Sequence, residues 1–195
     1  MNQYLPQVVP TRRPLVFWLV SAAVVTLIIS LSVIAPIAAA GGHSEIAEGI
    51  YRGFGIFCHQ RPDRSYFIDG HKLAVCSRCT GLYAGFAFTL LIYPLLRSLR
   101  SAATPPRKVL FFAALPLLID FSLTFLGIWE NTHTSRLLTG ALLGSVVVFF
   151  VMPGIADLSL RGLRLSTPPA PRFTLTSPES IAAAPSDYSA PERRI

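Results

Sequence analysis

The sequence predicts an all-α membrane protein, a bundle of four transmembrane helices with a cysteine- and histidine-containing loop outside the membrane. Charged residues make up only 14% of the chain, whereas an ordinary soluble domain carries about 25%. The charges are gathered between apolar runs long enough to cross a bilayer, which takes about 20 helical residues. Because basic residues flank these runs, the net charge of +7 fits contact with lipid headgroups, and we expect no nucleic-acid partner.

Four apolar runs qualify as spans. They are residues 15–40, about 76–96, 109–129 and 137 to about 160. Pro116 lies well inside the third run, where a proline can kink the helix. The third and fourth runs are joined by a short polar connection, so we expect these two helices to pack as an antiparallel pair.

The ends of the chain differ from the membrane domain, which we place at residues 15–164. Residues 1–14 form the predicted N-terminal segment, and Arg12-Arg13 before an apolar stretch loosely resembles a twin-arginine export signal. The apolar stretch is longer than the signal core of about 7–15 residues, so we expect an uncleaved anchor. Residues 165–195 are rich in proline, serine and alanine and have too few large apolar residues to bury a core, which predicts a disordered tail.

The distribution of basic residues predicts which side of the cell membrane each segment faces. Arginine and lysine gather before the first span, in the short loop between the second and third spans, and after the fourth span. These segments are expected in the cytoplasm together with both termini. The segment around Cys58 also carries arginines, but the order of the spans places it on the extracytoplasmic side.

All three cysteines of the chain lie in one segment before and at the start of the second span. Cys76 and Cys79 have the two-residue spacing that zinc sites and dithiol redox sites share. Together with Cys58 and His59 they offer a set of three thiolates and one imidazole, which satisfies tetrahedral zinc. Three interpretations stay open: a site for zinc or another transition metal, a redox dithiol, and a structural disulfide with one cysteine left over.

Several polar residues outside the cysteine pair are candidates for the same site. Arg78 lies inside the Cys76–Cys79 motif, where a guanidinium would lower the pKa of a thiol or hold an anion. Asp120 is the only acidic residue deep in an apolar run, and we place it near the bilayer midplane, where carboxylates usually have a function. The alternative is a protonated side chain hydrogen-bonded to Ser122, to Thr124 or to another helix. The other candidates are Arg61, Arg64, Ser65, Tyr83, Asn131 and Arg136.

Two pairs of glycines, each four residues apart, lie in the second and fourth spans. They are Gly81 with Gly85 and Gly140 with Gly144. Small residues at this spacing allow helix backbones to approach closely. We interpret them as packing positions, either within the bundle or against partner helices, including a second copy of the chain.

A longer pattern runs from the cysteine segment into the third and fourth spans. It consists of Cys58-His59-Gln60, Pro62, Arg64, Ser65, Cys76-x-Arg78-Cys79-Thr80-Gly81-x-Tyr83-x-Gly85, Pro116, Asp120, Asn131, Arg136, Thr139 and Gly140. This pattern resembles the prokaryotic membrane family called domain of unknown function 2085, over about residues 50–150. The resemblance implies an integral membrane location and groups these residues as one site, but it implies no particular activity.

We therefore expect a membrane protein with a metal site at the mouth of the bundle, formed by Cys58, His59, Cys76 and Cys79. At least two of the sulfurs should lie within about 4–5 Å of each other, and Asn131 should approach them from the connection before the fourth span. The alternatives are a membrane thiol–disulfide oxidoreductase that passes electrons to a quinone and a scaffold with a structural disulfide. The substrate is not specified by the sequence.

Overall fold

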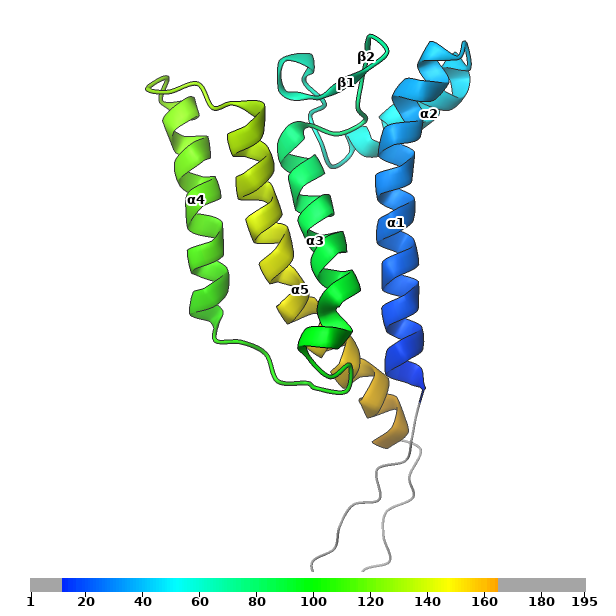
Figure 1. Ribbon diagram of the computed structural model, residues 1–195, viewed down its shortest axis with the longest axis vertical. Helices are drawn as coiled ribbons and strands as arrows, with labels where there is room; N and C mark the ends of the chain where they lie inside the picture. Colours follow the sequence, from blue (N-terminus) through cyan, green and yellow to red (C-terminus); the bar gives the residue numbers. More distant parts are fainter. Residues whose placement is uncertain (1–11, 165–195) are drawn as a thin grey trace, which may run out of the picture.

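The computed structural model describes residues 12–164 of the chain, with the side chains of residues 12–158. Four of the helices in that range are long and apolar enough to cross a membrane: α1 (Arg13–Ala40), α3 (Ser77–Leu96), α4 (Arg107–Phe125) and α5 (His133–Arg164). The predicted helical membrane bundle is therefore confirmed. Figure 1 shows α3 and α5 at the centre, with α1 on one flank and α4 on the other. The predicted tail at residues 165–195 lies outside the described residues.

The end of α4 differs from the prediction, because this helix stops at Phe125, four residues before the end of the apolar run. Gly127 adopts a left-handed φ of 69°, and its N–H donates to the carbonyl of Thr124. The next N–H, of Ile128, donates to the carbonyl of Leu123 at 3.0 Å. These two bonds form a Schellman motif, which ends a helix irrespective of how apolar the following residues are.

The early end of α4 changes the position of Asp120. The residue lies five positions before the last residue of the helix, or about 7.5 Å at 1.5 Å per residue. The expectation that Asp120 lies near the bilayer midplane assumed that the helix continues to Trp129, and the earlier end places Asp120 closer to the helix terminus than that expectation did. Asp120 lies near the end of α4 that faces the cysteine segment.

The segment between α1 and α3 is folded over one end of the bundle. It contains the short helix α2 (Ser44–Gly55), the 3-10 turn η1 (Pro62–Arg64) and an antiparallel hairpin of β1 (Phe67–Ile68) and β2 (His71–Lys72). In Figure 1 this segment lies at the end of the bundle opposite the two described ends of the chain. An even number of membrane spans produces this arrangement.

The glycine pairs bring α3 and α5 into backbone contact within the chain. A Cβ atom on Gly81 would overlap the carbonyl oxygen of Leu137, and one on Gly85 would overlap that of Ala141. Gly140 and Gly144 approach the backbone of α3 in the same way. Since both helices start at the same end of the bundle (Figure 1), this packing places the first turn of α3 beside the first turn of α5. The glycine faces are therefore used between spans of one chain.

Helix α1 is attached to this central pair by polar contacts as well as apolar ones. The indole N–H of Trp18 donates to the carbonyl of Leu90 in α3 at 2.8 Å. Near its other end, the carbonyl of Ser32 accepts a hydrogen bond from the N–H of Ala74, which leads into α3, at 3.2 Å. These contacts support the packing of α1 as one of the four spans.

Candidate functional site

The three cysteines come together at the mouth of the bundle. The sulfur atoms of Cys58, Cys76 and Cys79 all lie within 4.8 Å of one another, and none of the three is in a disulfide. Cys58 is buried, and the other two are half-buried. The predicted approach of the thiols is confirmed, including that of Cys58, which is 18 residues from Cys76 in the sequence.

The start of α3 explains why the thiols meet there. Cys76 is the residue that precedes the helix and Cys79 lies in its first turn, in agreement with the predicted start of this span at about residue 76. The backbone N–H of Cys76 donates to the sulfur of Cys58 at 3.2 Å. This contact ties the end of the α2 segment to the helix start, where free N–H groups and the helix dipole favour negative charge.

The environment of Cys76 favours its thiolate form. Hydrogen bonds from the thiols of Cys58 and Cys79, and from the backbone N–H groups of Cys79 and Arg78, hold the pKa of the Cys76 thiol well below its usual value, although burial acts in the opposite direction. Thiolates are the forms that bind metals and attack disulfides. The cluster is thus prepared for either chemistry.

A set of hydrogen bonds holds the loop that carries Cys58. Gln60 has a left-handed φ of 47°, which is uncommon for a residue other than glycine. Its buried side chain donates to the carbonyl of Tyr51 at 2.6 Å. The backbone carbonyl of Gln60 in turn accepts a hydrogen bond from Nζ of Lys72 at 2.7 Å. Ser65 is buried in the same loop and donates to the carbonyl of Arg61 at 2.9 Å. The hydroxyl of Ser65 therefore supports the loop.

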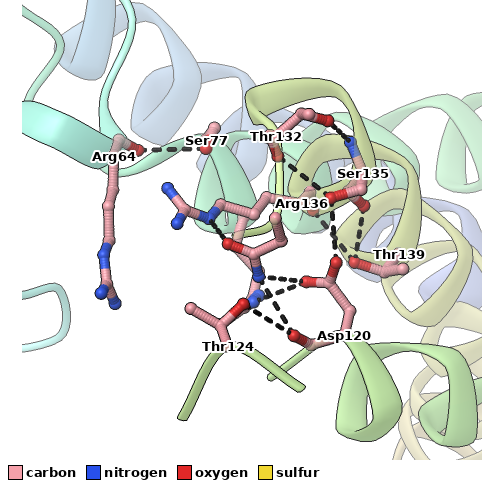
Figure 2. Close-up of polar contacts among 10 residues, drawn as sticks. Arg64, Ser77, Asp120, Thr124, Thr132, Ser135, Arg136 and Thr139 are labelled. Carbon is pink, nitrogen blue, oxygen red and sulfur yellow. Dashed lines mark hydrogen bonds and ion pairs between the residues drawn. The ribbon is translucent and has the colours of Figure 1, made fainter. Parts of the chain in front are cut away.

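Asp120 is the centre of a second polar cluster beside the thiols. Its carboxylate accepts hydrogen bonds from Arg78 at 2.8 Å, from Asn131 at 2.7 Å and from Ser135 at 2.9 Å. Figure 2 shows Asp120 facing Ser135 and the first turns of α5. One guanidinium and two neutral donors are the partners that an ionised carboxylate needs.

Asn131 extends this cluster to Arg136. Its side-chain oxygen accepts a hydrogen bond from Nε of Arg136, while its amide group donates to Asp120. Asn131 in the connection before α5 therefore contacts Asp120, whereas Arg136 in α5 lines the cavity of the thiols. Arg78 connects the two clusters, because it lies between Cys76 and Cys79 in α3 and pairs with Asp120 in α4.

One cavity of about 400 Å³ joins the thiols to the surrounding arginines. It is lined by the three cysteines, His59, Gln60, Phe57, Phe121 and the arginines at 61, 64, 78 and 136. His59 is exposed. It does not belong to the cluster of ligand atoms within 4.8 Å of one another, which consists of the three sulfurs. Tyr83 instead lines a separate apolar cavity of about 600 Å³ formed with residues of α1 and α2.

Sequence reasoning did not select Ser77 and Ser135 for the site, and it included Gln60 only as part of the family pattern. Ser77 is buried and donates to the carbonyl of Arg64 at 3.0 Å, and this bond attaches η1 to the start of α3. A signal for Gln60 was present in the Cys58-His59-Gln60 string. The roles of Ser77 and Ser135 depend on contacts between segments distant in the sequence, for which no local pattern exists.

Comparison with known proteins places this site in a family. The family model described as a predicted membrane protein (DUF2085) matches residues 58–150. An uncharacterised protein of Methanocaldococcus jannaschii is 38% identical over 104 residues, which are 53% of this chain and 67% of the relative. The chain belongs to the DUF2085 family. A second relative, an uncharacterised protein of Methanothermobacter thermautotrophicus, is 36% identical over 87 residues, 45% of this chain and 77% of the relative.

The segment that matches the DUF2085 family model contains the whole candidate site. It starts at Cys58 and contains every candidate site residue, whereas α1 and α2 precede it. No solved structure matches this chain. The two relatives are described as uncharacterised, so the chemistry has to be argued from the site itself.

Proposed function

We propose that this DUF2085 protein is a metal-binding membrane protein in which Cys58, Cys76 and Cys79 hold one transition-metal ion, with zinc as the best fit. The observation that carries the proposal is the convergence of three free thiols within 4.8 Å. Three sulfur ligands suit zinc, which accepts thiolates without a redox change.

The distances support this assignment. Three sulfurs bound at about 2.3 Å to a tetrahedral zinc ion lie about 3.8 Å apart. Since all three sulfurs lie within 4.8 Å of one another, no separation has to shorten by more than about 1 Å, which small side-chain rotations achieve. The N–H of Cys76 already donates to the sulfur of Cys58, as backbone groups commonly do around metal-bound thiolates.

The fourth coordination position is assigned to His59 or to a ligand from the cavity. His59 is adjacent to Cys58 and lines the same cavity, but its exposed imidazole has to turn inward to reach the sulfurs. Zinc sites with three protein ligands keep the fourth position for water or substrate, whereas structural zinc sites are closed by four protein ligands. The role of His59 therefore separates a reactive centre from a structural one.

The proposal is tested by metal analysis of the full chain purified in detergent without chelators. We expect about one equivalent of zinc per chain, released by Cys58→Ser and by Cys76→Ser. Less than about 0.2 equivalents of any transition metal in the folded wild-type protein would contradict a bound ion. The variant His59→Ala tests whether His59 is the fourth ligand. Its matched control is His71→Ala, because His71 is an exposed histidine in the hairpin and lies outside the thiol cluster.

A second candidate function, a thiol–disulfide oxidoreductase, is favoured by Tyr83 and the apolar cavity. Tyr83 follows Cys79 by one helical turn and lines the cavity of about 600 Å³, which lies beside the thiols and has room for a quinone ring. Two thiols would form one disulfide, and two electrons and two protons would reduce the quinone to a hydroquinone. Thiol trapping distinguishes the two functions: the oxidoreductase requires a disulfide that reductant opens and quinone restores, whereas the metal site requires cysteines that stay reduced.

We also propose that the cysteine segment faces the extracytoplasmic side and that the described chain ends face the cytoplasm. The support is the basic loop of residues 97–108 at the opposite end of the bundle. In a background where the three cysteines are replaced by serine, Asp69→Cys should react with a membrane-impermeant maleimide in intact cells, and Ser98→Cys should not. The reverse labelling pattern would overturn this orientation.

A further inference from the structure

The cavity beside the thiols has an excess of positive charge. Four arginines line it, at positions 61, 64, 78 and 136. Two carboxylates pair with them: Asp63 contacts Arg61 and Arg64, and Asp120 contacts Arg78. Within the part of the chain whose side chains are described, Arg136 has no ion pair with a carboxylate.

Arg136 is the residue that makes this excess costly. It is 8% exposed, and its guanidinium makes a single hydrogen bond among the described residues, from Nε to Asn131. The N–H groups of its two terminal nitrogens therefore remain available to donate hydrogen bonds to a ligand. A buried charge without a counter-ion is strongly unfavourable, so an anion in the cavity would stabilise the protein.

Arg64 approaches the same space from a different element. It lies in η1, and only its Nε contacts Asp63, at 3.3 Å. Together with Arg78 and Asn131 it also lines a small adjoining cavity of about 70 Å³. Figure 2 shows the guanidinium of Arg136 extending toward the side on which Arg64 lies. The two groups thus face the cavity from two segments that are distant in the sequence.

We propose that this arginine cavity binds a phosphate group. A carboxylate has two oxygens in one plane, and at Asp120 one arginine and two neutral donors are enough to hold them. Guanidinium groups that converge from different directions suit a tetrahedral anion with more acceptor oxygens. The phosphate belongs either to a soluble ion or ester or to a phospholipid headgroup, since the cavity lies at the starts of α3 and α5, where headgroups are found. Its volume of about 400 Å³ and its walls of Phe57 and Phe121 leave room for more than the phosphate itself.

This inference does not depend on the metal, because the arginines and the thiols are separate groups. The test is calorimetric titration of the full chain, delipidated in a maltoside detergent, with inorganic phosphate and with dioctanoyl phosphatidic acid. We expect Arg64→Gln and Arg136→Gln to weaken binding of the probe at least about tenfold, the loss expected for a charged hydrogen-bond pair. Arg52→Gln is the matched control: it removes the same charge from an exposed arginine paired with Glu48, and it should change binding less than about twofold.

The outcomes separate the sources of the phosphate and the two proposals. Phosphatidic acid bound at least about tenfold more tightly than inorganic phosphate assigns the cavity to a headgroup, and equal affinities assign it to a soluble phosphate. Wild-type protein that binds neither probe overturns the proposal, and so does unchanged binding in Arg64→Gln. If Arg136→Gln does not fold, the result for Arg64→Gln decides. Binding lost when the three cysteines are replaced by serine but kept in both arginine variants would place the phosphate on the metal and also overturn it.

Discussion

The thiol cluster and the carboxylate cluster lie on either side of Arg78, but they differ in how far their groups are satisfied. Asp120 accepts hydrogen bonds from three side chains, which hold α3, α4 and the start of α5 together. Cys58, Cys76 and Cys79 instead lie close together as free thiols. The carboxylate of Asp120 is already held by three donors, whereas the three free sulfurs can still take a ligand. We infer that the carboxylate cluster positions the helices and that the thiol cluster performs the chemistry.

The largest expected effect comes from breaking the carboxylate cluster. Asp120→Asn leaves Arg78 partly buried without its counter-ion, which should lower the free energy of unfolding by about 3 kcal/mol. Asp63→Asn is the control, since Asp63 is exposed and pairs with the exposed Arg61 and the half-buried Arg64, and it should leave the unfolding midpoint unchanged. Zinc affinity measured on the folded fraction of Asp120→Asn should equal that of the wild type. A variant with normal stability and impaired zinc binding would contradict the division of roles.

Breaking the thiol cluster should have the opposite pattern. Cys76→Ser should lower zinc affinity at least about 100-fold, because even the loss of an outer partner of a metal ligand costs about 10–100-fold. In the metal-free state, the variant should differ from the wild type only by the stability that the Cys76 thiolate contributes. Competition with a chromogenic chelator measures the affinity, and a chelator should lower the unfolding midpoint of the wild type but not of the variant.

The pH dependence of stability sharpens the same comparison. Because the folded protein lowers the pKa of the Cys76 thiol, the folded state binds fewer protons there than the unfolded state. The stability of the metal-free protein should therefore rise with pH up to the unfolded thiol pKa of about 8.5. This contribution is fully present above that pH and is lost as the pH falls toward the folded pKa. Cys76→Ser should remove this part of the slope, and an identical slope in the variant would show that the thiolate is not favoured by folding.

The smallest expected effect belongs to His59. If its imidazole is the fourth ligand, His59→Ala lowers zinc affinity by about tenfold or more, whereas the exposed control His71→Ala leaves it unchanged. Equal affinities in both variants would assign the fourth position to a ligand from the cavity. Zinc competition at a single pH is sufficient for this measurement.

The sequence was informative where the signal is local or repeated. Hydropathy located the four spans, and the Cys76–Cys79 spacing together with Cys58 located the thiol cluster. Hydropathy also misplaced the end of α4, because the apolar run continues beyond the Schellman motif at Gly127. The exposure of His59 and the bond from Ser135 to Asp120 depend on how distant segments meet, which neither spacing nor composition encodes.

The central claim is that three thiolates hold one metal ion at the mouth of the bundle, and X-ray absorption spectroscopy of the zinc-loaded full chain tests it most directly. We predict three sulfur atoms at about 2.3 Å from zinc and one nitrogen or oxygen at about 2.0 Å. In Cys58→Ser the fitted sulfur number should fall by one. A spectrum fitted by nitrogen and oxygen ligands alone, or a sulfur number unchanged in that variant, would contradict the claim.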